Sequence, residues 1–159
     1  MNLLPLFQWC EASWLGSSIR ASQFMFPVIE AFHLVAFAAI GGCVLLVDLR
    51  LLGVAMKRLA VVDLARETRP FFLGSLTVML VSGTLLFLSE SVKCYYSNPF
   101  WIKMSALLTV IIFTFTVRRT VIGIDEARLG RFWGRLAAAT SIALWATVGW
   151  GGRWIGFSG

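Results

Sequence analysis

The sequence is short of charge: only 14% of its 159 residues are Asp, Glu, Lys or Arg. Soluble globular chains carry about 25% charged residues, whereas 58% of this chain is hydrophobic. This composition excludes a disordered protein and an ordinary soluble enzyme. Three cysteines are too few for a disulfide-rich mini-protein. The chain also lacks a Walker loop and a glycine-rich dinucleotide turn. It has one histidine, so a Ser/His/Asp set with a second histidine is absent as well.

What the sequence has instead is long apolar runs. A helix needs about 17–25 mostly apolar residues to cross a bilayer, and four runs approach or reach that length. They predict spans at residues 24–47, 71–89, 100–117 and 136–152. We therefore expect an all-α fold, an integral membrane four-helix bundle that forms a single domain over residues 1–159. The excess of basic residues is not arranged in a stripe, so the expected partner is the lipid bilayer and not a nucleic acid.

The first twenty residues do not resemble a signal peptide, because they lack a basic start and Trp9, Glu11 and Trp14 interrupt the apolar stretch. Residues 3–19 are predicted to form a short interfacial helix instead. Its tryptophans would lie at the level of the lipid headgroups.

The basic residues predict the orientation. Ten of the 14 Lys and Arg residues fall in the connections after the first and third runs. Because cytoplasmic loops are enriched in Lys and Arg, we expect a bacterial inner-membrane protein with both termini outside. The ten residues are Arg50, Lys57, Arg58, Arg66, Arg69, Arg118, Arg119, Arg128, Arg131 and Arg135.

Two ionisable residues interrupt the first span, and such residues are candidate functional groups by default. Glu30 and His33 are three residues apart and so share one helix face. His33 is nine residues from the start of the span, about 13 Å deep at the helical rise. Arg20, Lys103 and Arg153 are predicted to lie at the same outer half of the membrane, so the bundle would hold a polar pocket there.

Three interpretations of this pocket are open. In the first, Glu30 and His33 pair structurally with Lys103 or Arg153. In the second, His33 is the axial ligand of a b-type haem. In the third, Glu30 and His33 form half of a metal–carboxylate site that is completed across a homo-oligomer interface.

The haem interpretation assigns a role to each residue. Haem needs an imidazole on its iron and cations for its propionates. Arg20, Lys103 and Arg153 would meet the propionates, and Glu30 would fix the tautomer of His33. A single histidine excludes bis-histidine ligation within one chain. The short chain and its small-residue helix faces predict a homo-oligomer, a dimer or trimer.

Other polar and small residues favour structural roles. Cys10 and Cys94 are both expected on the outer side, where a disulfide or a copper site would be permitted, although free thiols are favoured. Asp48 and Arg50 are interpreted as a solvated or headgroup pair. The small residues Ser82 and Gly83 permit close helix approach in the second span.

The order of these features resembles a family of small four-helix bacterial membrane proteins of unassigned function. The residues that carry the resemblance are Trp9-x-Glu11, Ser18-Ile19-Arg20, Pro27-x-x-Glu30-x-x-His33, Asp48-x-Arg50-Leu-Leu-Gly53, Asn98-Pro99-Phe100-x-x-Lys103 and Gly152-Arg153-Trp154. More remotely, the chain is similar to the membrane cytochrome b561 and copper-resistance D groups, which implies haem or copper work at the outer face. The expected function is a haem-b-binding membrane redox protein, and the alternative is a cofactor-free structural or small-solute transport protein.

Overall fold

A computed structural model describes residues 3–124 and 131–157 of the chain. These residues form helices and turns and contain no strand, which confirms the all-α class. Arg128 lies outside the described residues. In chain order the elements are α1 (Leu4–Glu11), α2 (Trp14–Ala21), α3 (Met25–Leu51), α4 (Val61–Ser89), α5 (Ser91–Tyr96), α6 (Asn98–Phe113), the π-helix η1 (Thr114–Arg118), α7 (Arg119–Gly123) and α9 (Arg131–Phe157).

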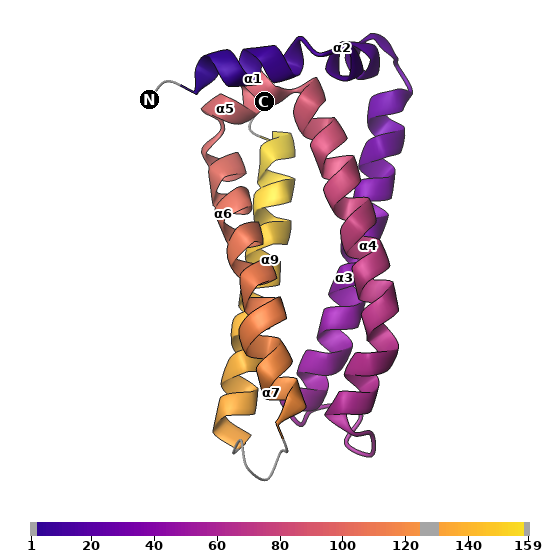
Figure 1. The fold of residues 1–159 in the computed structure, drawn as a ribbon, viewed down its shortest axis with the longest axis vertical. Coiled ribbons are helices and arrows are strands. Elements are labelled where there is room, and N and C mark those ends of the chain that lie inside the picture. The colour runs from indigo at the N-terminus through magenta and orange to yellow at the C-terminus, as the bar shows by residue number, and fades with distance from the viewer. Residues whose placement is uncertain (1–2, 125–130, 158–159) are drawn as a thin grey trace.

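Four long helical segments run side by side and alternate in direction: α3, α4, α6 continued by η1 and α7, and α9 (Figure 1). α3 packs on α4, α6 packs on α9, and the two pairs meet mainly through α3 and α9. α1 and α2 lie across one end of the four segments, and α9 ends there as well (Figure 1). We call this the α1–α2 end.

Within the described residues, three helical segments are long and apolar enough to cross a membrane: Met25–Leu51, Val61–Ser89 and Asn98–Gly123. They contain the first three predicted spans, except that the first span was predicted to begin one residue earlier, at Phe24. The fourth predicted span, 136–152, lies inside α9, which is as long as α3 but is not among the candidate spans. Its Ala, Gly, Ser and Thr residues make α9 less apolar, so its passage through the membrane stays a prediction.

The N-terminal segment forms two short helices where the sequence predicts one. The break falls at Ala12–Ser13, where the side chain of Ser13 accepts a hydrogen bond from the backbone N–H of Gly16 at 3.2 Å. This is a helix N-cap, and it starts α2 as a separate helix. α2 then packs on α4, and α1 packs on α5.

The end of α3 is fixed by a glycine. Gly53 has φ of +75°, a left-handed conformation that side chains disfavour. The N–H of Val54 donates to the carbonyl of Leu49 at 3.0 Å, and that of Gly53 donates to the carbonyl of Arg50 at 3.0 Å. This pair of bonds is a Schellman motif. It turns the chain back toward α4 and explains why a glycine follows this apolar run.

The main core lies in the middle of the four long segments. Ile40 and Val110 are completely buried there, beside Trp145 and Val148 of α9. The fully buried residues of α3 begin only at Ala36 and continue to Asp48. Tight packing on α3 is therefore confined to the middle and to the end opposite α1 and α2.

Candidate functional site

His33 packs directly against α4. Its Nδ1 lies 3.0 Å from Oγ of Ser82. A Cβ added to the neighbouring Gly83 would lie only 3.1 Å from Cε1 of the imidazole. The absence of a side chain at Gly83 therefore lets the ring reach Ser82. His33 is half-buried, whereas Ser82 is buried.

The hydrogen bonds of Ser82 favour one tautomer of His33. The Ser82 hydroxyl lies 2.7 Å from the carbonyl of Val78 and 3.2 Å from that of Met79, two acceptors within its own helix. With its single proton donated to one of these carbonyls, Oγ accepts from Nδ1 of His33. This arrangement corresponds to the tautomer in which Nδ1 carries the proton and Nε2 the lone pair.

Lys103 is brought to the same region from α6. It lies across two glycines of α9: a Cβ on Gly151 would be 3.1 Å from Cβ of Lys103, and one on Gly152 would be 3.4 Å from Nζ. The ammonium is close enough for its charge to act on His33. Among the described residues Lys103 forms no ion pair within 4 Å. The site thus combines an imidazole with a cation that no carboxylate of the described residues pairs with.

The other predicted site residues lie elsewhere. Glu30 is exposed on α3 and makes no hydrogen bond to His33 within the described part of the chain. Ser82, and not Glu30, holds Nδ1. Arg153 is exposed near the end of α9.

Arg20 fastens the N-terminal helices to the rest of the fold. Its guanidinium pairs with Glu11 at 2.9 Å and donates to the carbonyl of Ser89 at 2.9 Å, at the end of α4. Glu11 in turn accepts a hydrogen bond from the N–H of Val92 at 2.6 Å. Arg20 and Glu11 therefore join α1 and α2 to the α4–α5 junction, a role that the sequence did not reveal.

The cysteines of the described residues are free thiols. Cys94 is buried beneath α1, in a cluster with Phe7 and Phe100. Burial, with a smaller effect of the Glu90 charge, raises the pKa of Cys94 to about 11, so the thiol is protonated at neutral pH. No group of three or more His, Cys, Asp or Glu side chains that could hold a metal ion occurs within the described ranges.

A second polar region lies in the half of the structure opposite α1 and α2. Nε of Arg118 lies 3.0 Å from Oδ1 of Asp48, which is 0% exposed, and Arg118 is only 8% exposed. The interpretation of Asp48 as a solvated partner of Arg50 was therefore wrong. Arg50 instead donates to the carbonyl of Leu59 at 2.6 Å and closes the α3–α4 turn. Arg118 likewise points inward and does not belong to a basic loop.

Sequence spacing held a signal for this pair. Asp48 continues the buried series Ile40 and Val44 at intervals of four residues, and Arg118 continues Val110 and Thr114 in the same way. Both charges thus fall on core-facing positions of their helices.

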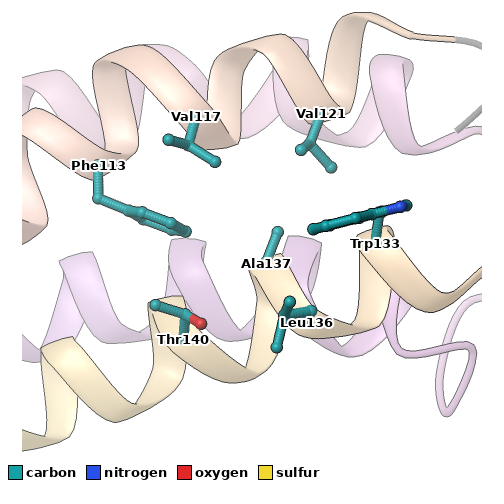
Figure 2. A pocket seen from close by; sticks show the side chains of 7 residues that line it. All are labelled: Phe113, Val117, Val121, Trp133, Leu136, Ala137 and Thr140. Atoms are coloured by element: carbon teal, nitrogen blue, oxygen red, sulfur yellow. The ribbon is translucent and has the colours of Figure 1, made fainter.

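An apolar pocket of about 230 Å³ lies on the next face of the same helices (Figure 2). Its side chains point between the α6–η1–α7 segment and α9. They are Phe113, Val117, Val121, Trp133, Leu136, Ala137 and Thr140. This lining offers hydrophobic contact but no titratable group.

Comparison with known proteins identifies the family and nothing beyond it. No curated protein matches the chain, and no solved structure matches it either. A relation to cytochrome b561 is therefore unsupported. The match to a family covers residues 6–158, almost the whole sequence. The chain belongs to the family described as a family of unknown function, DUF6644.

Proposed function

We propose that this protein binds one b-type haem through His33 and acts as a membrane redox protein. The observation that carries the proposal is the 3.0 Å contact between Nδ1 of His33 and Oγ of Ser82, because Nε2 keeps its lone pair when Nδ1 is the donor. Histidines that bind metals generally donate their other ring N–H to a fixed acceptor, which orients the ring and strengthens the ligand. Haem would supply a one-electron centre at this position.

The surroundings of His33 also support the proposal. Haem iron needs only one protein ligand, so the site does not require the cluster of ligands that a bare metal ion would. Lys103 supplies a cation near the imidazole, as a propionate requires. Arg153 is kept as a second propionate partner on the basis of its place near the end of α9. Arg20 is assigned to the fastening of α1 and α2, because its contacts are made to Glu11 and Ser89.

We place the protein in a bacterial inner membrane with α9 as the fourth span of a four-helix bundle. The alternation of α3, α4, α6 and α9 supports this arrangement, as does the clustering of basic residues in two connections. Both termini would then lie outside, with the His33 site in the outer half. A homo-oligomer, a dimer or trimer, remains part of the proposal, and its mass in mild detergent tests it.

The direct test is an absorption spectrum of the purified protein, expressed with adequate haem supply. We expect a Soret band and a pyridine-haemochrome signal in the wild type, and their loss in His33→Ala with the helical content retained. Lys103→Met should weaken haem retention less, because it removes one charged contact. A colourless, well-folded wild type would overturn the proposal.

A cofactor-free structural or transport role is the second candidate. The observation that favours it is the same close contact of His33 with Ser82 and Gly83, since a histidine that only joins two helices would make it too. This role predicts a colourless wild type whose stability falls in His33→Ala. An iron or copper site remains a candidate only across two copies of the chain, given the lack of ligand clusters in the described ranges.

A further inference from the structure

The half of the structure opposite α1 and α2 contains a group of polar atoms that are buried and unpaired. Within the described residues, six buried side-chain atoms lack a hydrogen-bond partner, and five of them belong to η1, α9 and the facing residue of α3. We call these five the inner polar cluster. They are Oδ2 of Asp48, Oγ1 of Thr114, Nη2 of Arg118, Oγ of Ser141 and Nε1 of Trp145.

Three of the five residues interact with one another, and helix spacing puts the other two one turn away. Arg118 contacts Asp48 directly. The hydroxyl of Ser141 is close enough to the same carboxylate to interact with it, but not in full hydrogen-bond geometry. Thr114 precedes Arg118 by four residues on η1, and Trp145 follows Ser141 by four residues on α9, so each lies about one turn away on the same face.

Leaving these atoms unpaired would be costly. An unsatisfied buried polar group costs about 1–3 kcal/mol, and more when it is charged. Buried polar groups in native proteins are therefore paired with protein atoms or with ordered water. Five such atoms on facing turns of α3, η1 and α9 favour a bound polar molecule among them. The neighbouring π-helix η1 also favours a bound molecule here, because π-helical turns are frequent at functional sites.

The donors and acceptors of the cluster specify the occupant. The guanidinium and the indole can only donate, the carboxylate can only accept, and the two hydroxyls can do both. Asp48 and Arg118 cancel each other's charge, so an added ion would be left without a counter-charge. The occupant must therefore be neutral, accept from Arg118 and Trp145 and donate to Asp48, and water is the smallest molecule that does so. A buried water needs two to four polar partners, and the cluster offers five.

We propose that the inner polar cluster is an internal water-binding site that hydrates the Asp48–Arg118 pair within the membrane-spanning part of the protein. The neighbouring apolar pocket (Figure 2) is not that site, because its lining shares no residue with the inner polar cluster and Thr140 is its single hydroxyl. The site is independent of the proposed haem, since it shares no residue with His33, Ser82 or Lys103.

Hydroxyl-radical footprinting in ¹⁸O-labelled water tests the proposal directly on the full-length protein. Radicals formed from bound water oxidise the side chains beside it. Trp145 is 5% exposed and should nevertheless incorporate the label. Met79, which is 3% exposed and readily oxidised, packs in the same core but does not belong to the inner polar cluster, and it is the matched control. Labelling of Trp145 well above Met79 supports the site, and equal protection of both residues overturns it.

The substitution Thr114→Val gives a second test, which is decided by the direction in which the unfolding midpoint changes. In a hydrated site it removes a hydrogen bond to water, so the unfolding midpoint in mild detergent should fall by about 2–4 °C. In a dry site it removes an unsatisfied hydroxyl, so the midpoint should stay or rise. Thr109→Val on α6, where the hydroxyl is exposed and bonds its own helix at 2.8 Å, is the control and should change little. An unchanged or raised midpoint in Thr114→Val would contradict the proposal.

Discussion

The two polar regions of this protein differ in how their groups are satisfied. Near the α1–α2 end, glycines let helices approach closely: Gly83 admits the His33 ring, and Gly151 and Gly152 admit Lys103. These groups remain partly accessible. In the opposite half, Asp48 and Arg118 are buried among packed helices and several of their neighbours lack partners. In the first region His33 and Lys103 are half-buried, whereas in the second region the charges of Asp48 and Arg118 are enclosed.

The largest expected effect comes from Arg118→Leu. It leaves the Asp48 carboxylate buried without its partner, which should cost about 3–5 kcal/mol of stability. Unfolding in mild detergent measures the loss, and adding Asp48→Asn to the same chain should recover most of it. The control is Asp63→Asn, which breaks the exposed Asp63–Arg66 pair at 3.1 Å and should cost below about 1 kcal/mol. Equal, small losses in both variants would show that the buried pair does not stabilise the fold.

A smaller loss is expected from Gly16→Ala at the α1–α2 end. A Cβ at this position would overlap the backbone carbonyl of Leu88, which cannot move aside easily. α2 must then shift away from α4, at a cost of about 1–3 kcal/mol. Gly41→Ala on α3 is the control because no atom lies within 4 Å of its added Cβ. If both variants unfold at the same temperature, the close packing of α2 on α4 is not important for stability.

Gly83→Ala should affect the His33 site more than the fold. The imidazole must give way by a few tenths of an ångström, which weakens its bond to Ser82, while the better helix propensity of alanine offsets up to about 1 kcal/mol. We expect weaker haem retention with a nearly unchanged unfolding midpoint. Gly74→Ala on the same helix meets nothing within 4 Å and should leave the spectrum unchanged. Identical haem content in the two variants would argue against His33 as the ligand.

Glu30→Gln should have the smallest effect. The carboxylate is exposed and does not hold the imidazole, so its loss acts only as a distant charge. Potentiometric titration should find that the reduction potential rises by less than about 60 mV. For a one-electron centre this is less than a tenfold change in the equilibrium constant for reduction. A much larger shift, or loss of the chromophore, would indicate that Glu30 contacts His33.

The sequence predicted the helical class and three of the apolar helices because long apolar runs determine them almost alone. It also pointed to His33 and Lys103, since ionisable residues inside such runs are rare. It could not predict that Ser82 orients His33, because that contact depends on how α3 and α4 pack. The Asp48–Arg118 pair was missed for another reason. Both residues lie near the ends of apolar runs, where charges usually face lipid headgroups, and only their spacing along the helices indicates the core.

The central claim is that Nε2 of His33 binds haem iron, and one absorption spectrum tests it most directly. Wild-type protein and His33→Ala are expressed with adequate haem supply, purified in the same detergent and compared at equal concentration. The account predicts a Soret band and a pyridine-haemochrome signal in the wild type alone, with equal helical content in both. A folded wild type without a Soret band, or an unchanged band in His33→Ala, would contradict it.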